Sequence, residues 1–179
     1  LKNLKNAYIF IEKPLDSSFK NYKIFLNYIA RNQNKIFVGH NMRFHPGYVK
    51  LKKILGDRKI LNKVHYTIFK CSKNLKDYHS YEDYKISYAA RKELGGGVCL
   101  TAVHEIDMMI DLFGNAIKIK SHADKLSALK LSVEDFSLSF YRSYFFRSKV
   151  ISLLILDFIQ LTEERYIKIQ TSDTYIIGD

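Results

Sequence analysis

The sequence predicts a mixed fold, α/β at the amino-terminal end and α+β in the rest, and three observations lead to that prediction. Two short apolar runs near the amino terminus flank a stretch with helical spacing, which indicates a βαβ unit. Two further helical patterns follow in the middle of the chain. After Gly114 the apolar residues alternate with a period of two, which indicates a mostly antiparallel sheet with helices on one face.

The amino-terminal βαβ unit is read from three consecutive stretches. Residues 7–11 and residues 35–39 are short, apolar and rich in residues that favour strands. Residues 19–30 lie between them and carry apolar side chains at three- and four-residue steps, as in an amphipathic helix. Asp16 or Ser17 suits the N-cap of that helix.

The carboxyl ends of the two predicted strands are a candidate ligand site. Strands joined by one helix form a parallel pair, and ligands bind open α/β sheets at the carboxyl edge. Lys13 and the segment 40–43 are expected at that edge. Pro14 forces Lys13 out of the helical region, and a cis bond there would re-aim the lysine.

The middle of the chain predicts a helix, a strand, a loop and another helix. Pro46 suits the first turn of a helix that Gly56 ends. Residues 61–69 read as a strand, and residues 71–88 as a long, polar, tyrosine-rich loop. A strongly apolar helix is expected over residues 98–113.

The carboxyl-terminal part predicts a sheet. Alternating or continuous apolar residues mark strands at 116–122, 136–140, 150–158 and 167–169. The change of pattern divides the chain into residues 1–45 and residues 46–179.

Composition narrows the class of protein. The chain has 179 residues, 47% of them hydrophobic, so we expect a packed core. The net charge of +11 raises the prior for anionic partners, but short basic runs favour a solvated lysine-rich surface over nucleic-acid binding. No stretch reaches the roughly 18 apolar residues of a membrane span. Cys71 and Cys99 fit neither a disulfide framework nor a zinc site, so a reducing cytoplasm is the simplest compartment.

Polar residues on the second helix are candidates for chemistry. Thr101, His104, Asp107 and Asp111 share one stripe of an otherwise apolar helix. Such a stripe either lines a cleft or is satisfied internally. A metal site is not expected, because Met108 stands where an H-E-x-x-H motif needs its second histidine.

Two further features have both a structural and a functional interpretation. Residues 95–97 are three glycines before that helix, which suits either a flexible turn or an anion at the helix start. Lys13 is either a surface lysine or, in a partly dry cleft, an acid–base group.

Several segments together resemble the Gfo/Idh/MocA oxidoreductases, the glucose-fructose oxidoreductase and inositol dehydrogenase group. They occur in the order of that family and cover nearly the whole chain. The matching segments are Phe10-Ile11-Glu12-Lys13-Pro14-Leu15, Gly39-His40-Asn41-Met42-Arg43-Phe44-His45-Pro46, Tyr88-Ala89-Ala90-Arg91-Lys92-Glu93-Leu94-Gly95-Gly96-Gly97-Val98, His104-Glu105-Ile106-Asp107 and Asp157-Phe158-Ile159-Gln160.

The resemblance implies an incomplete NAD- or NADP-dependent oxidoreductase. Residues 1–45 would be the last part of a Rossmann domain, and residues 46–179 a substrate domain whose sheet forms a homo-oligomer. The reaction would transfer a hydride between nicotinamide and a hydroxyl carbon of a sugar, cyclitol or sugar-nucleotide. No nucleic acid or membrane partner is expected.

The resemblance also implies roles for individual residues. Lys13 and His104 would be catalytic. The remaining implied positions are Asn41, Arg43, Tyr88, Thr101 and Asp107 for substrate, and Glu12, Lys13, Pro14 and Arg91 for cofactor.

Three departures from the family pattern leave an alternative open. The glycine-rich strand–turn–helix does not precede Leu1, the chain stops earlier than family members, and Thr101 stands where the family places an aspartate. Asp107 follows His104 in the sequence, whereas the family's aspartate precedes the histidine, so Asp107 would only partly replace that aspartate. The isolated fragment is therefore expected to be inactive, and the alternative is a non-catalytic assembly or regulatory domain that keeps the sheet for oligomerisation.

Overall fold

A computed structural model describes residues 4–16, 18, 20–79, 81–145 and 148–179. The chain divides into two compact units, residues 1–40 and residues 41–179. This division lies a few residues before the boundary expected from the sequence, so the segment 41–45 belongs with the second unit. Each unit is described by itself.

Unit 1 contains the predicted βαβ arrangement. Strands β1 (Tyr8–Ile11) and β2 (Lys35–Val38) pair in parallel, with Tyr8 opposite Lys35, and helix α1 (Tyr22–Arg31) connects them. The parallel pair expected from the sequence is therefore confirmed.

Helix α1 begins later than the sequence predicted. Its N-cap position is Asn21, whereas the Asp16 carboxylate accepts a hydrogen bond from the backbone N–H of Ser18. Asp16 is therefore used in a local turn five positions too early to cap the helix. Ser17 and Phe19, which the sequence placed at this helix start, lie outside the described residues.

Unit 1 has little core of its own. No hydrophobic side chain is buried among its described residues, and Tyr8 and Phe10 remain 83% and 63% exposed. The rings of Phe10 and Phe37 stack on this open face with their centroids 5.6 Å apart. Two strands and one helix bury too little apolar surface to be stable alone.

Unit 2 is built on a six-stranded sheet with the order β4-β5-β6-β3-β7-β8. Only the central β3–β6 pair is parallel, so the predicted, mostly antiparallel sheet is confirmed. The strands are β3 (Val64–Ser72), β4 (Ala116–Asp124), β5 (Phe136–Phe145), β6 (Ser148–Asp157), β7 (Glu164–Thr171) and β8 (Tyr175–Gly178).

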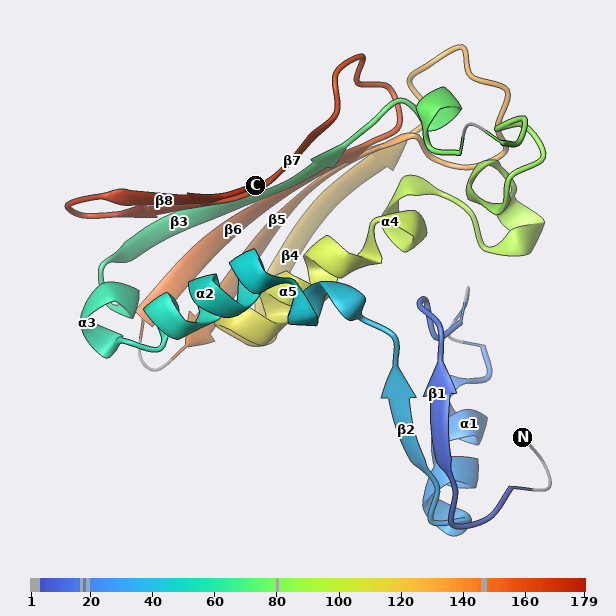
Figure 1. The fold of residues 1–179 in the computed structure, drawn as a ribbon, viewed down its shortest axis with the longest axis horizontal. Helices are drawn as coiled ribbons and strands as arrows, with labels where there is room; N and C mark the ends of the chain where they lie inside the picture. The colour runs from blue at the N-terminus through green and yellow to red at the C-terminus, as the bar shows by residue number, and fades with distance from the viewer. Residues whose placement is uncertain (1–3, 17, 19, 80, 146–147) are drawn as a thin grey trace. The chain divides into compact units, whose positions relative to one another are not determined.

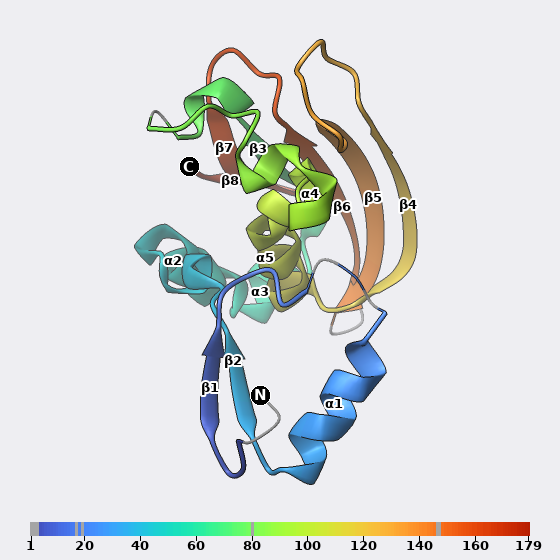
Figure 2. The same ribbon diagram turned by 90° about the vertical axis from the view of Figure 1, so that its right-hand side faces the viewer.

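The helices of unit 2 cover one face of this sheet (Figures 1 and 2). Their side of the sheet holds the core, which includes Phe69, Phe113, Leu154 and Ile169, each at most 1% exposed. The α-helices are α2 (Pro46–Leu55), α3 (Arg58–Leu61), α4 (Val98–Thr101) and α5 (Val103–Phe113), and the 3-10 helices are η1 (Asn41–Phe44), η2 (Leu75–Asp77), η3 (Tyr88–Ala90) and η4 (Lys92–Leu94).

Two elements of unit 2 show where a predicted element starts or breaks differently in the structure. The strand expected over residues 61–69 starts only at Val64, because Asp57 accepts a hydrogen bond from the N–H of Lys59 and caps the short helix α3. The helix expected over residues 98–113 is broken at Ala102, whose backbone is not helical (φ −94°, ψ 34°). No proline or glycine marks that break in the sequence.

The other face of the sheet is open and carries a short apolar row, with Lys168 on β7 and Lys120 on β4 at its two ends. Ile68, Leu153 and Phe140 lie side by side across β3, β6 and β5. The residues that alternate with them, such as Phe69, Leu154 and Ser139, are buried beneath the helices. Leu138, next along this open face of β5, is 43% exposed.

None of the helices in the described part of the chain has the length and hydropathy needed to cross a membrane.

Candidate functional site

The carboxyl ends of β1 and β2 share one edge of unit 1. Glu12, Lys13 and Pro14 follow β1 directly, and the Lys13–Pro14 peptide bond is cis. The N–H of Gly39, after β2, donates to the Ile11 carbonyl at 2.8 Å. A Cβ on Gly39 would lie 2.9 Å from Cζ of Phe10 and 3.2 Å from Oε1 of Glu12, so the side chains of Phe10 and Glu12 extend over this glycine.

In unit 2 the structure brings Arg43 and Asp107 together. Nε and Nη2 of Arg43 each donate to one oxygen of the Asp107 carboxylate at 2.7 Å, which is a bidentate pair. This hydrogen bonding raises the pKa of Arg43 above its ordinary value, against the opposing effect of burial. Two residues assigned to substrate from the sequence therefore bind each other.

A second carboxylate, Asp111, extends this pair into a network. Its Oδ1 lies 3.3 Å from Nη1 of Arg43, and its Oδ2 accepts from the Tyr48 hydroxyl and from Nζ of Lys52, both at 2.7 Å. Burial opposes ionisation of Asp111, but the hydrogen bonds from Lys52 and Tyr48 and the Arg43 charge outweigh it and hold its pKa below the ordinary value. Burial also raises the pKa of Tyr48.

His104 lies in the first turn of α5, and its side chain is almost fully buried, with 9% exposed. Thr101, at the end of α4, is 5% exposed. Burial raises the pKa of the Tyr88 hydroxyl, and its hydrogen bond with Thr101 acts in the opposite direction. The structure therefore joins Tyr88 to Thr101, as two candidate substrate residues.

Arg91 is also paired within the chain. Its Nε and Nη2 both approach Oε1 of Glu93 at 2.7 Å, on an exposed turn. This pair lies next to the triple glycine in the sequence. Asn41, another candidate substrate residue, is the first residue of η1.

The triple glycine forms a tight turn against the chain's own groups. A Cβ on Gly97, which has φ 105°, would lie 2.4 Å from Oε1 of Glu134. The same oxygen accepts the N–H of Cys99 at 3.2 Å, at the start of α4. The Glu134 carboxylate thus occupies the start of α4. Of the two interpretations of the triple glycine, this favours a turn over a binding site for an external anion.

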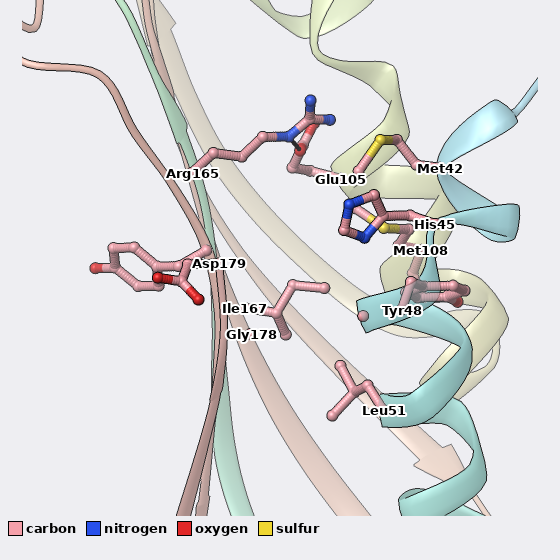
Figure 3. A pocket seen from close by; sticks show the side chains of 12 residues that line it. Met42, His45, Tyr48, Leu51, Glu105, Met108, Arg165, Ile167, Gly178 and Asp179 are labelled. Carbon is pink, nitrogen blue, oxygen red and sulfur yellow. Dashed lines mark hydrogen bonds and ion pairs between the residues drawn. The ribbon is translucent and has the colours of Figure 1, made fainter.

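A cavity of about 330 Å³ lies between the helices and the β7–β8 side of the sheet (Figure 3). Its walls are mainly apolar, and one end holds Glu105, which is completely buried, with Arg165 donating to it at 2.7 Å. It shares no lining residue with the sites assigned from the sequence. The lining residues are Met42, His45, Gly47, Tyr48, Leu51, Glu105, Met108, Arg165, Tyr166, Ile167, Gly178 and Asp179.

Sequence reasoning missed the partners rather than the acidic residues themselves. Asp107 and Asp111 stand four apart on α5, and Tyr48 and Lys52 stand four apart on α2. The four-residue spacing places each pair on one face of its own helix, but it does not show that Tyr48 and Lys52 both bind Asp111. The pairing of Glu105 with Arg165 had no local signal, because 60 positions separate them.

The side chains and glycines of this chain bear on two kinds of cofactor, a metal ion and a dinucleotide. Within the described ranges, no group of three or more His, Cys, Asp and Glu side chains is placed to hold a metal ion. A dinucleotide pyrophosphate needs a glycine-rich strand–turn–helix, and Gly39 is the one glycine in residues 1–40. The residues of this chain therefore do not fit a whole dinucleotide.

The fold matches solved oxidoreductases over nearly the whole chain. A myo-inositol 2-dehydrogenase from Lactobacillus plantarum has a TM-score of 0.76 and 17% identity, covering 96% of this chain and 50% of the other. The WlbA dehydrogenase from Bordetella pertussis, in complex with NADH and UDP-GlcNAcA, has a TM-score of 0.75 and 15% identity, covering 96% and 51%. GenD2 from gentamicin A biosynthesis, in complex with NAD, has a TM-score of 0.76 and 19% identity, covering 97% and 48%.

These likenesses confirm the fold that the sequence resemblance implied. The chain spans about half the length of the structures it matches. No protein-family model and no curated protein matches the sequence.

Proposed function

We propose that this chain is part of a nicotinamide-dependent oxidoreductase of the Gfo/Idh/MocA type. The reaction is hydride transfer between NAD or NADP and a hydroxyl carbon of a sugar, cyclitol or sugar-nucleotide. The fold likeness to dehydrogenases over 94–97% of the chain is the observation that carries this proposal. Because those structures are about twice as long, the activity belongs to the whole protein. Two free cysteines are compatible with a cytoplasmic location.

In this proposal Lys13 and His104 handle the proton of the reacting hydroxyl. A lysine at a strand end can polarise a hydroxyl oxygen, and a nearly buried imidazole can accept its proton while the carbon gives up a hydride. Tyr88 and Thr101 bind substrate hydroxyls through their own hydroxyl groups. Glu12, Pro14 and Arg91 contact the cofactor, and Asn41 and Asp107 line the substrate side. The proposed domain limits, 1–45 and 46–179, leave Glu12, Lys13 and Pro14 in the Rossmann part and His104 in the substrate part, while Asn41 and Arg91 each act across that limit.

The test is His104→Ala in the complete protein, with His122→Ala as the matched control. His122 is an exposed histidine on β4, so its loss should leave turnover unchanged. Removing a general acid–base group lowers kcat by about 10²- to 10⁴-fold. Turnover of His104→Ala within a few-fold of wild type would remove His104 from the acid–base role.

Cofactor binding is tested separately by equilibrium dialysis of residues 1–179 with NADH and NADPH. We expect little or no binding, because the pyrophosphate cradle is not among these residues. Micromolar affinity would show that the remaining residues suffice to hold the cofactor.

The second candidate is a non-catalytic assembly role, and the apolar row on the open face of the sheet favours it. Ile68, Leu153 and Phe140 form a continuous row on that face. A second copy of the chain would cover such a row in a homo-oligomer. This role is compatible with catalysis, so self-association alone does not separate the two.

The oligomer is tested by sedimentation of Leu153→Glu beside Leu161→Glu. Leu161 is 90% exposed in a loop and is a control for added charge. We expect Leu153→Glu alone to shift the chain to monomer. A wild-type chain that is monomeric at micromolar concentration would refute the interface.

A further inference from the structure

We propose that Arg43 is a positioning residue that holds η1, and with it Asn41, against the turn of α5 that carries His104. This assignment rests on the proposed function, and it means that Arg43 does not bind an anionic group of the substrate. The substrate-binding residues of unit 2 then recognise uncharged hydroxyl groups.

The geometry of the contact supports a clamp. A bidentate arginine–carboxylate pair fixes both the distance and the orientation of the two groups. Arg43 stands two residues after Asn41 in η1, and Asp107 stands three residues after His104 in α5, on a neighbouring position of the same helix face. The pair thus connects the short segment that carries Asn41 with the turn that carries His104.

The burial of the carboxylates shows that this is more than a surface ion pair. The side chains of Asp107 and Asp111 are only 12% and 14% exposed, whereas that of Arg43 is 41% exposed. Two nearly buried carboxylates one helical turn apart repel each other unless cations lie between them. Arg43 contacts both carboxylates, and Lys52 contacts the second.

The charge balance argues against an anion receptor. Arg43 and Lys52 are offset by Asp107 and Asp111, so an incoming phosphate or carboxylate would meet two negative charges close to the guanidinium. Three N–H groups of Arg43 already donate to these carboxylates. Breaking a partly buried bidentate pair to bind a substrate anion would be unfavourable.

The first experiment is an NMR titration of wild-type residues 1–179, which needs no variant. The Nε–Hε signal of Arg43 is followed while inorganic phosphate, glucuronate or myo-inositol is added. We expect slow exchange of this proton and no change with phosphate or glucuronate. A saturable shift of the Arg43 signal with either anion would overturn the proposal.

The second experiment tests positioning with Asp107→Asn and the matched control Lys52→Met. Asp107→Asn should speed exchange of the Arg43 Nε proton by roughly tenfold or more, and should shift the Asn41 side-chain amide and the His104 ring signals. Lys52→Met removes a cation of the same network but leaves the Arg43–Asp107 pair, so these signals should stay. Asn41 and His104 signals that do not move in Asp107→Asn would overturn the positioning role, even if the protein were less stable.

The two experiments do not measure turnover. Failure of the clamp therefore leaves the oxidoreductase proposal intact, and failure of His104→Ala to lose activity leaves the clamp intact.

Discussion

Gly96→Ala is the substitution for which the structure predicts the largest effect from one methyl group. A Cβ at this position would lie 2.4 Å from the Tyr88 carbonyl oxygen, 2.7 Å from that of Ala89 and 2.8 Å from that of Arg91. All three atoms belong to the backbone, so no side-chain rotation relieves the overlap. The turn must open until each distance reaches at least 3.0 Å.

The cost follows from the clash and from the hydrogen bonds that hold the turn. The N–H of Gly96 donates to the Arg91 carbonyl at 3.0 Å, and the N–H of Gly97 donates to that of Ala89 at 2.9 Å. Overpacking costs about 1–3 kcal/mol, and each weakened hydrogen bond adds about 1 kcal/mol. With both hydrogen bonds weakened, we therefore expect Gly96→Ala to lower the free energy of unfolding by about 3–5 kcal/mol.

The assay is urea unfolding followed by far-ultraviolet circular dichroism, with Gly178→Ala as the control. No atom lies within 4 Å of a Cβ at Gly178, so that change should stay near wild type. Tyr88 and Arg91 supply two of the obstructing carbonyls, so amide exchange of residues 88–97 should also accelerate. A loss below about 0.5 kcal/mol for Gly96→Ala would refute the reasoning.

Three further predictions concern buried ionisable groups. Arg165→Met removes the guanidinium that pairs with the buried Glu105 carboxylate, so it should lower the free energy of unfolding by about 3–5 kcal/mol in urea titrations. Lys63→Met breaks an exposed pair with Asp173 and should change the free energy of unfolding little. Equal effects of the two substitutions would contradict this prediction. Because the pKa of Asp111 is lowered in the fold, its ionised form stabilises the protein above the unfolded value, and this contribution is lost as the pH falls below about 4. Asp111→Asn should therefore flatten the acid side of a stability–pH profile, and an unchanged acid side would refute that role. Burial raises the pKa of the Cys71 thiol to about 12, so a disulfide reagent at pH 8 should react far more slowly with folded than with urea-unfolded protein, and equal rates would contradict its burial.

Much of the fold could be predicted because it depends on local pattern. The run–helix–run order of residues 7–39 has one sterically favoured connection, which is the parallel pair that the structure contains. Alternation after Gly114 specifies strands because successive side chains point to opposite faces. Neither pattern could locate the break at Ala102, where nothing in the local sequence opposes a continuous helix.

The candidate site was predictable only in part. The composition of the stripe with Thr101, His104, Asp107 and Asp111 follows from helical spacing, and the structure places those residues on α4 and α5. Whether each side chain is available to a ligand depends on partners elsewhere in the chain. Arg43 and Asp107, both assigned to substrate from the sequence, bind each other across 64 positions.

The sequence by itself therefore determined the order and type of the main elements and the apolar faces, and it named Lys13 and His104 as candidates for proton transfer. Periodicity and steric preference act over a few residues, so both can be recognised in the sequence without knowing which distant segments pack together. Only the tertiary structure decided that Arg43 is neutralised, that Glu134 occupies the start of α4, and that Arg165 reaches the buried Glu105. Pairing of charges depends on distances between segments far apart in the chain, and those distances exist only once the sheet and helices have packed.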